Sequence, residues 1–313
     1  MNDRLKGKSI AITGSGRGIG KALALQFASE GAKIVVSDFG GDGEGGGAAS
    51  RIPADEVVAQ IRESGGEAVA VYDDVATSAG GESVVRAAVD SFGRLDGLVC
   101  NAAIMAPAKP LWEMSEEEWD SVVRVNLKGQ FCPVRAAIPV MRKQRSGRLI
   151  YFSSSAAIAA FHPGVGYDDA SPYGVSKAGV LGLMWGTATT LAEHGITSNA
   201  IFPGAATRLV DLRLPEEAEA FRSDKASGTW RDPKYIAPIV AYLLSDQGAS
   251  INGQLFGATG GRLSHYGTIE PQKVIATEDE VGFSMDEVFR RFPTEFGAEH
   301  NYDPAAFPPP VKD

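Results

Sequence analysis

The chain has 313 residues, of which 44% are hydrophobic and 22% charged, and its formal net charge at pH 7 is −9. These proportions are typical of a globular protein with a sizeable core, and the acidic balance argues against a nucleic-acid or anionic-membrane surface. No apolar run approaches the ~18 residues that a membrane span needs, and the polar start MNDRLKGK does not resemble a signal peptide. We therefore expect a cytoplasmic protein.

Two cysteines, Cys100 and Cys132, lie in apolar stretches. Their number and surroundings indicate buried, reduced thiols and no disulfide framework. No spacing of His and Cys residues suits a metal ion, so we expect no metal site.

Strand-like apolar runs alternate with helical patterns up to about residue 260. This alternation predicts an α/β fold, a single doubly wound parallel sheet of about seven strands with helices on both faces. We assign residues 1–262 to this domain, with a lid of short helices at about 205–231. Residues 263–313 are expected to form a C-terminal extension with one amphipathic helix, SMDEVFRRF, and a loosely ordered, proline-rich end.

The first strand, SIAIT, runs straight into a glycine-rich turn and a helical pattern. Free amide N–H groups and the helix dipole at such a turn face a phosphate, and glycine lets the backbone touch the ligand. The sequence therefore predicts a dinucleotide site with Gly14, Arg17, Gly18, Ile19 and Gly20 as binding residues. The plainer alternative is a tight turn without a ligand.

The second strand ends at Asp38. An acid at this position can accept hydrogen bonds from both ribose hydroxyls of NAD, and its charge repels the 2′-phosphate of NADP. Arg17 has the opposite influence, because a nearby cation tolerates that phosphate. We expect Asp38 to lie closer to the 2′ position and therefore predict NAD; a solvated acid at a strand end is the alternative.

Residues 39–49 are rich in glycine, and they form either a flexible loop or an edge over the adenosine. Asp74 and Val75 end the third strand, where Asp74 is placed to accept from the adenine amine, although an acid in a plain turn would look the same. The fourth strand leads directly into Asn101 and Ala102, at the crevice where open α/β sheets bind ligands.

A long helix is expected to begin with a capping box at residues 115–118. Pro133 and Pro139 should kink this helix or end its regular bonding. Asn126 lies on the turn before that irregularity. Its amide could hold a water against a freed carbonyl, or it could be a polar core residue.

Two further strands deliver polar residues to the same edge of the sheet. The fifth, GRLIYFSS, ends in three serines: Ser153, Ser154 and Ser155. Serines often form turns, but one of these is a candidate to hydrogen-bond a substrate carbonyl. The sixth strand ends in Pro203 and Gly204, and Thr207 lies just beyond it.

Tyr173 and Lys177 open the next predicted helix, for which Ser171 is a suitable cap. Residues four apart lie one above the other on a helix, so the phenol and the ammonium share a face. A neighbouring cation lowers the pKa of a tyrosine from its ordinary value near ~10. The pair can then act as a general acid and base, although Tyr and Lys also occur four apart by chance.

Several of these features, in this order, resemble the classical short-chain dehydrogenases/reductases over about residues 6–260: TGSGRGIG, Asp74-Val75, Asn101-Ala102-Ala103, Asn126, Ser154, Tyr173-x-x-x-Lys177 and Pro203-Gly204. The resemblance implies a Rossmann-type sheet, a nicotinamide cofactor and a Ser154–Tyr173–Lys177 site supported by Asn126. It also implies that the tyrosine and lysine contact the cofactor together with the segment around Thr207. The family's usual NNAG reads CNAA here.

Within that family, three stretches resemble the (3R)-hydroxyacyl-CoA dehydrogenase units of peroxisomal multifunctional enzymes of type 2. These are SDFGGDGEGGGAAS, ATRLVDLRLPEEA, and DPKYIAPIVAYLL with the later NGQLFGATGG. One departure is a loop at 161–172 that is longer than the family pattern and borders the substrate. His162 and Tyr167 in this loop could touch a substrate, or the loop could be plain surface; the insertion puts acyl-CoA in doubt.

Together these features predict an oxidoreductase that transfers a hydride between NAD(H) and a secondary alcohol or ketone, with a 3-hydroxyacyl thioester as one candidate substrate. Tyr173 exchanges the proton, Lys177 holds the nicotinamide ribose, Ser154 orients the substrate oxygen and Asn126 positions a water. The alternatives are an NADPH-dependent ketoreductase of the oxoacyl or steroid type and a non-catalytic dinucleotide-binding protein. The resemblance also implies a homodimer or homotetramer that associates through the two long helices.

Overall fold

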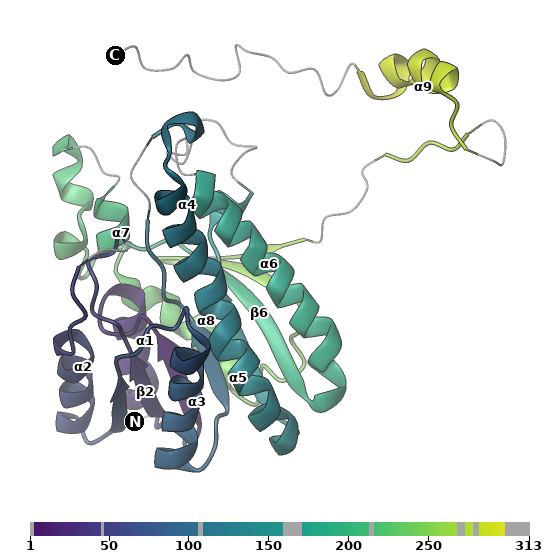
Figure 1. Cartoon of the computed structure of the whole chain (residues 1–313). Helices are drawn as coiled ribbons and strands as arrows, with labels where there is room; N and C mark the ends of the chain where they lie inside the picture. The colour runs from purple at the N-terminus through teal and green to yellow at the C-terminus, as the bar shows by residue number, and fades with distance from the viewer. Residues whose placement is uncertain are drawn as a thin grey trace.

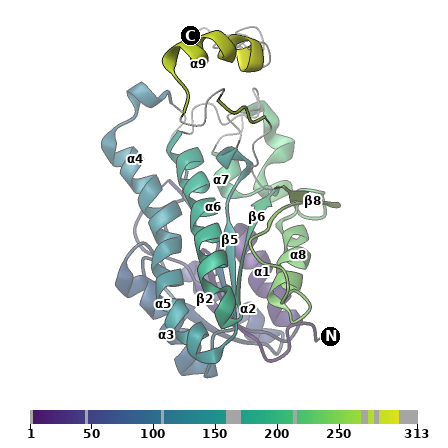
Figure 2. The same ribbon diagram turned by 90° about the vertical axis from the view of Figure 1, so that its right-hand side faces the viewer.

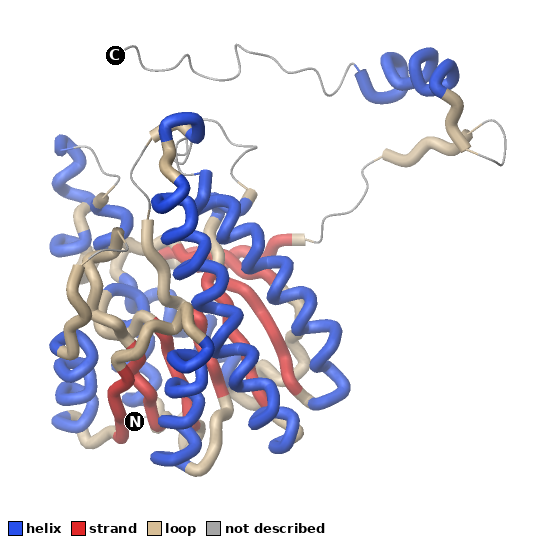
Figure 3. Tube along the Cα trace, viewed as in Figure 1, coloured by secondary structure: helices blue, strands red, loops and turns tan. Residues whose placement is uncertain are grey.

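The structure is a computed structural model that describes residues 3–44, 47–105, 109–158, 171–212, 216–267, 273–277 and 282–297 (Figure 3). These residues form one eight-stranded sheet with the strand order β3-β2-β1-β4-β5-β6-β7-β8. The strands are β1 (Ser9–Thr13), β2 (Lys33–Ser37), β3 (Glu67–Val71), β4 (Gly97–Cys100), β5 (Gly147–Phe152), β6 (Ile196–Pro203), β7 (Leu255–Thr259) and β8 (Arg262–Tyr266).

Helices cover both faces of this sheet (Figures 1 and 2). The α-helices are α1 (Gly18–Ser29), α2 (Ile52–Glu63), α3 (Ser78–Phe92), α4 (Glu116–Val123), α5 (Gly129–Gln144), α6 (Ser171–Leu191), α7 (Arg208–Asp211), α8 (Ala237–Leu244) and α9 (Met285–Phe292). The shorter segments are η1 (Leu111–Glu113), η2 (Arg124–Lys128), η3 (Ser155–Ala157), η5 (Ala192–His194), η6 (Glu216–Phe221), η7 (Ser223–Lys225), η8 (Pro233–Ile236) and η9 (Pro293–Gly297).

Two hydrophobic cores lie on opposite faces of the sheet. One contains buried residues of α1, α2 and α8, and the other contains buried residues of α3, α5 and α6. Strands β1 to β7 run parallel and are mostly buried, as expected for a parallel sheet covered on both sides. The predicted α/β fold is therefore confirmed.

The strand order reverses next to β1, which pairs with β2 on one side and with β4 on the other. Helices that follow these strands pack on opposite faces, and this leaves a crevice at their carboxyl ends. Residues from the ends of β1, β2, β4, β5 and β6 meet in this crevice, which positions the site described below.

The eighth strand was missed by the prediction of about seven strands. β8 pairs antiparallel with β7, so the sheet extends to Tyr266, beyond the boundary predicted at residue 262. Thr259 lies opposite Arg262, and Gly260 and Gly261 form the two-residue turn between them, with Gly260 at φ +50°. The sequence RLSHY has no apolar alternation because this edge strand is largely exposed. The division into a domain and an extension stays a prediction.

The predicted long helix is present in three parts, and its irregularity is not where we expected it. The capping box is confirmed, since Ser115 accepts from the N–H of Glu118 and the Glu118 side chain accepts from the N–H of Ser115. Helix α5 continues through Pro133 and Pro139, whereas the π segment η2 precedes it. The wider turn ends at Lys128, directly before Gly129, whose carbonyl would clash with the Pro133 ring in a regular helix.

The remaining predictions on organisation are partly tested. Short helices α7, η6 and η7 occupy the segment predicted as a lid, and α9 forms where the amphipathic helix was expected, capped by Ser284. The proline-rich end lies outside the described residues. Cys100 and Cys132 are both buried and unpaired. In the described ranges, no helix is long and apolar enough to cross a membrane, and no group of His, Cys, Asp and Glu is arranged for a metal ion.

Candidate functional site

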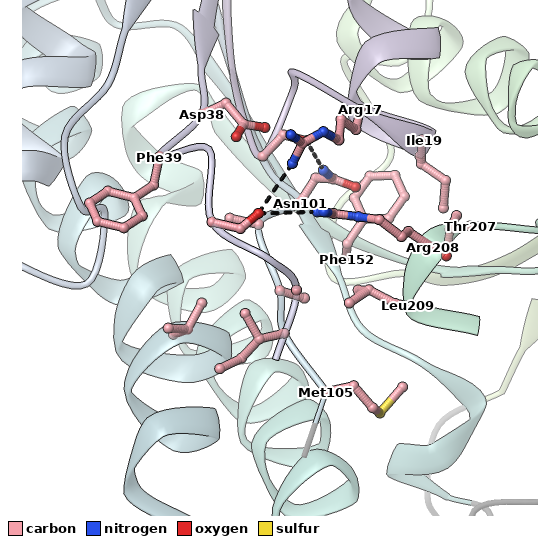
Figure 4. A pocket seen from close by; sticks show the side chains of 18 of the residues that line it. Arg17, Ile19, Asp38, Phe39, Asn101, Met105, Phe152, Thr207, Arg208 and Leu209 are labelled. Atoms are coloured by element: carbon pink, nitrogen blue, oxygen red, sulfur yellow. Dashed lines mark hydrogen bonds between the residues drawn. The ribbon is translucent and has the colours of Figure 1, made fainter. Parts of the chain in front are cut away.

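A pocket at the carboxyl edge of the sheet collects most of the predicted site residues (Figure 4). The predicted residues that line it are Gly14, Arg17, Gly18, Ile19, Asp38, Asp74, Val75, Asn101, Ala102, Ser154, Tyr173, Lys177, Pro203 and Thr207. Three other predicted residues, Gly20, Asn126 and Gly204, are not among the residues that line it. The sequence therefore located the pocket, and the roles of the individual residues stay predictions.

The glycine-rich turn has the backbone shape of an anion site. Gly14 and Gly18 have φ values of +65° and +53°, which favour glycine. A Cβ on Gly20 would lie 2.2 Å from the Gly14 carbonyl oxygen, so no side chain fits there. Helix α1 starts directly after the turn, and no side chain caps its N-terminus. Its first amide N–H groups therefore remain available for a phosphate.

Asp38 holds the glycine-rich turn against the end of β2. Its Oδ2 accepts from the N–H of Gly16 at 2.7 Å, and its Oδ1 accepts from the N–H of Gly40 at 2.8 Å. A carboxylate offers about four lone-pair sites, so both oxygens can still accept a further hydrogen bond. Asp38 thus combines a structural role with a position at the pocket wall.

The glycine-rich segment after β2 forms an edge of the pocket. This favours the prediction of an edge over the adenosine, not that of a flexible loop. Residues 39–43 line the pocket, whereas residues 45 and 46 lie outside the described residues. The carbonyl of Gly41 accepts from the guanidinium groups of Arg17 and Arg208, and the carbonyl of Gly43 accepts from the N–H of Met105. The segment is therefore attached to three parts of the pocket rim.

Asp74 forms an ion pair that the sequence did not indicate. Its Oδ2 accepts from Nη1 of Arg124 at 2.5 Å, and its Oδ1 accepts from the N–H of Ala76 at 2.9 Å. Arg124 belongs to η2 and lines the pocket beside Asp74. Contacts of this kind depend on long-range packing between the β3 end and η2, and no local sequence pattern signals them.

Asn101 ties the end of β4 to the glycine-rich turn. Its Nδ2 donates to the carbonyl oxygens of Thr13 and Gly14, both at 3.0 Å. The hydroxyl oxygen of Thr13 accepts from the N–H groups of Asn101 and Ala102. These bonds hold the two strand ends that flank the crevice at a constant separation.

The predicted proton-exchanging pair lies at the other side of the pocket. Lys177 is only 2% exposed, its Nζ lies 5.5 Å from the centre of the Tyr173 ring, and it donates to the Phe152 carbonyl at 2.8 Å. Tyr173 is 9% exposed and also lines the pocket. The structure therefore confirms that the ammonium and the phenol share one helix face, and both line the pocket that the glycine-rich turn also lines.

Burial has a large effect on this lysine. Loss of solvent lowers the pKa of Lys177 from 10.5 to about 7. The ammonium then depends on its surroundings to stay charged at neutral pH, and the Phe152 carbonyl supplies one acceptor. An added acceptor or negative charge in the pocket would favour the protonated form.

Serines at the end of β5 position the start of α6. The Ser153 hydroxyl donates to the carbonyl of Lys177 at 2.7 Å, which joins strand and helix. Ser154 is 7% exposed, lines the pocket, and accepts a hydrogen bond from the N–H of Ala156. Ser153 and Ser154 both line the pocket, but the Ser153 hydroxyl is already donated to the Lys177 carbonyl, which leaves Ser154 as the better candidate to bond a substrate.

Asn126 is fully buried, and its side chain is used within the protein. Its Oδ1 accepts from the N–H of Ile104 at 2.8 Å, and its Nδ2 donates to the carbonyl of Ile104 at 3.0 Å and to the Ser176 hydroxyl at 3.3 Å. Asn126 lies within the π segment itself, not on a turn before the irregularity. The amide fixes the segment after β4 next to α6.

An apolar cluster surrounds Tyr173. Ile104, Met105 and Val122 are buried with it, and partly buried residues such as Leu209 pack against them. Figure 4 shows Met105 and Leu209 at the same end of the pocket. Residues 159–170, which include His162 and Tyr167 of the predicted insertion, lie outside the described residues.

The segment after β6 closes the pocket opposite the glycine-rich turn. The N–H of Gly204 donates to the carbonyl of Ala258, and the Thr259 hydroxyl donates to the carbonyl of Gly204 at 2.7 Å. A Cβ on Gly18 would lie 3.6 Å from the Thr207 methyl group, so these two residues face each other. The pocket accordingly has a backbone-lined wall and a facing wall that follows β6.

Comparisons with known proteins agree with this geometry. A family model described as enoyl-(acyl carrier protein) reductase matches residues 14–262. A short-chain type dehydrogenase/reductase of Mycobacterium tuberculosis is 39% identical over 254 residues, which cover 81% of this chain and 82% of that protein. The crystal structure of a short chain dehydrogenase from Mycobacterium avium has a TM-score of 0.76 at 32% identity and covers 94% of this chain and 96% of that chain.

A longer relative matches over the same part of the sequence. Peroxisomal multifunctional enzyme type 2 of Mus musculus is 39% identical over 254 residues, which cover 81% of this chain. The match covers 32% of that protein, so this chain corresponds to about a third of its length.

Proposed function

The chain belongs to the classical short-chain dehydrogenase/reductase family, and on this premise we propose that it transfers a hydride between NAD(H) and a secondary alcohol or ketone. Family membership makes it an oxidoreductase with a nicotinamide dinucleotide cofactor. The likeness to peroxisomal multifunctional enzyme type 2 makes a 3-hydroxyacyl thioester one candidate substrate. The apolar cluster beside Tyr173 supports a substrate with an apolar part next to its reacting carbon.

The residues of the pocket fit a dinucleotide. The uncapped start of α1 suits a pyrophosphate, and Asp38 has lone pairs left for ribose hydroxyls. Asp74 and Val75 border the place proposed for the adenine, with Asn101 and Ala102 at the middle of the crevice. When bound, the nicotinamide supplies the hydride-transfer chemistry. We propose NAD over NADP because the Asp38 charge disfavours a 2′-phosphate.

In this proposal Tyr173 accepts the proton of the alcohol during oxidation and returns it during reduction. The ammonium of Lys177 stabilises the phenolate and donates to a ribose hydroxyl, and Ser154 donates to or accepts from the substrate oxygen. The observation that carries the proposal is the burial of the Lys177 ammonium beside the Tyr173 ring, at a pocket that begins at the glycine-rich turn.

Asn126 acts in this proposal by positioning its neighbours. Its amide bonds to Ile104 and Ser176 keep the apolar wall and helix α6 together. The water-holding role expected from the sequence stays a prediction.

The test compares the wild-type protein with Tyr173→Phe in assays with secondary alcohols, ketones and a 3-hydroxyacyl thioester. Loss of general acid–base help should lower kcat by about 10²- to 10⁴-fold. NADH binding, measured by fluorescence titration, should change little because the phenol ring is retained. Tyr242→Phe, at a partly exposed tyrosine outside the pocket, is the matched control. Full activity of Tyr173→Phe would contradict the proposal.

The position of Arg17 at the pocket wall favours a second candidate, an NADPH-dependent ketoreductase. Comparison of the Kd values for NADH and NADPH separates the two, since tighter binding of NADPH would overturn the NAD assignment. Binding of either dinucleotide without turnover of any alcohol or ketone would support a non-catalytic protein.

We also propose that the protein is a homodimer or homotetramer that associates through α5 and α6. Phe131 on α5 and Val175 on α6 are large apolar residues that are 45% and 50% exposed in the single chain. Sizing chromatography tests this proposal, and a monomeric elution volume would contradict it. The cytoplasmic location stays a prediction.

A further inference from the structure

Two guanidinium groups from opposite walls of the pocket meet at one carbonyl oxygen. Nη1 of Arg17 donates to the carbonyl of Gly41 at 3.1 Å, and Nη2 of Arg208 donates to the same oxygen at 3.3 Å. Arg17 belongs to the glycine-rich turn after β1, whereas Arg208 follows Thr207 beyond β6 (Figure 4). Their guanidinium groups converge on this oxygen from two different elements.

This arrangement brings two positive charges together without a salt bridge. In the described part of the chain, no carboxylate forms an ion pair with either guanidinium, and the Gly41 carbonyl is the acceptor they share. Partial burial and the charge of Arg17 lower the pKa of Arg208, and the charges of Asp38 and Asp42 offset this only in part. Each guanidinium has five N–H donors, so most donors of both groups remain available. An anion is the group that would relieve the repulsion and use these donors.

The positions where the Arg208 side chain begins and ends indicate which anion it can bind. It starts beside Thr207, whose methyl group would lie 3.6 Å from a Cβ on Gly18, so the Arg208 backbone is next to the glycine-rich turn where the pyrophosphate is proposed to bind. It ends at Gly41, three residues after Asp38, where the adenosine ribose is proposed to bind. The side chain therefore runs between the positions proposed for the pyrophosphate and for the adenosine ribose.

The glycine-rich segment takes part in the same arrangement. A Cβ on Gly43 would lie 3.4 Å from Leu209 and 3.7 Å from Nη2 of Arg208, so this segment packs against the residues after β6. The carbonyl of Gly43 also accepts from the N–H of Met105 at 3.0 Å. Any ligand that binds Arg208 is thereby connected to the segment that covers the adenosine side.

We propose that Arg208 binds the pyrophosphate of the dinucleotide from the side opposite the glycine-rich turn, together with Arg17, and connects the glycine-rich segment at residues 39–43 to the ligand. This inference rests on the proposed function, because it requires a dinucleotide in the pocket. It adds a residue that no sequence motif indicated, and it gives the glycine-rich segment a role in retaining the cofactor.

The test is a fluorescence titration of the purified protein with NADH and with NADPH, in the absence of substrate. Arg208→Gln should raise Kd about tenfold for both dinucleotides, since a charge-assisted hydrogen bond to the shared pyrophosphate is lost. Arg208→Lys keeps the charge but not the planar fork, so its Kd should lie between the two. Arg142→Gln, at an exposed arginine in the last turn of α5, changes the net charge equally and should leave Kd unchanged.

The results of this titration distinguish failure of the Arg208 inference from failure of the proposed function. An unchanged Kd in Arg208→Gln would overturn the inference while leaving the proposed function intact. A loss confined to NADPH would overturn it as well, because the residue would then contact a 2′-phosphate. Wild-type protein that binds neither dinucleotide would contradict both. Far-UV circular dichroism confirms folding, and Arg208→Lys carries the test if the glutamine variant fails to fold.

Discussion

One side of the pocket is formed mainly by backbone groups and the other mainly by side chains. On the side of β1 and β2 the surface is mostly backbone, with glycine amides, a helix start and a glycine-rich segment. On the side of β5 and α6 it consists of buried side chains that also form hydrogen bonds within the protein, as for Ser153 and Lys177. A backbone surface suits the dinucleotide, because its phosphates are the same in every reaction. Side chains, in contrast, can supply the proton transfer that one particular reaction needs.

This difference predicts how substitutions on each side affect ligand binding, activity and stability. Backbone surfaces should be insensitive to most substitutions but should not tolerate added volume. Side-chain surfaces should lose one function at a time, with effects on stability that depend on burial and charge.

The largest effect is expected for Gly20→Ala on the backbone side. Its Cβ would lie 2.2 Å from the Gly14 carbonyl oxygen and 2.8 Å from Nδ2 of Asn101, so the turn must move. We expect NADH binding to weaken at least about a hundredfold, which corresponds to about 3 kcal/mol. Gly182→Ala is the control, because its Cβ meets nothing within 4 Å; it should leave Kd unchanged and stabilise the helix by about 1 kcal/mol. Normal NADH affinity in Gly20→Ala would contradict the claim that the backbone side of the pocket does not tolerate added volume.

On the side-chain side, Lys177→Met should stabilise the protein without cofactor, and the gain should depend on pH. The pKa of Lys177 is about 7 when folded and 10.5 ordinarily, so between these values the unfolded chain binds one more proton and stability rises with pH. The native lysine therefore costs most below pH 7, about 5 kcal/mol at the upper limit.

Thermal unfolding checks this expectation. The melting temperature of Lys177→Met should exceed that of the wild type most at pH 6, and the difference should vanish toward pH 10. The Phe152 carbonyl keeps a donor in the variant, since Nε2 of Gln130 also bonds to it. An equal difference at all pH values would show that charge burial is not the cause.

A smaller loss is expected for Asn126→Ala. The change leaves the buried N–H and carbonyl of Ile104 without their partners, which costs about 2 kcal/mol of unfolding free energy. Ser176→Ala, which removes only the 3.3 Å contact to Asn126 and a bond to the Tyr173 carbonyl, should cost less. Denaturant unfolding measures both, and a larger loss in Ser176→Ala would contradict the positioning role of Asn126.

The backbone side was predictable because local rules produce it. A strand, a glycine-rich turn and a helix start are recognisable within about 15 residues, and the strand-end acid Asp38 follows from the same unit. The capping box at Ser115 and the Tyr173–Lys177 spacing were predictable for the same reason.

The features that sequence reasoning missed depend on contacts between distant segments. Arg124 pairs with an acid 50 residues away, and Arg208 reaches a carbonyl 167 residues away. The bonds of Asn126 to Ile104 exist because two elements pack together. The edge strand β8 escaped notice because its exposure removes the apolar pattern, although Gly260 and Gly261 were a usable hairpin signal.

That edge strand has a consequence for how copies of the chain can meet. An uncovered β7 would offer a row of unpaired amide and carbonyl groups to any extended chain nearby, and such edges promote aggregation. β8 occupies these groups and moves the open border to five residues that include Arg262 and His265, both exposed. At this edge, sheets of two copies could then join only through β8, which is short and polar, so strand addition here is disfavoured while pairing through helices stays open.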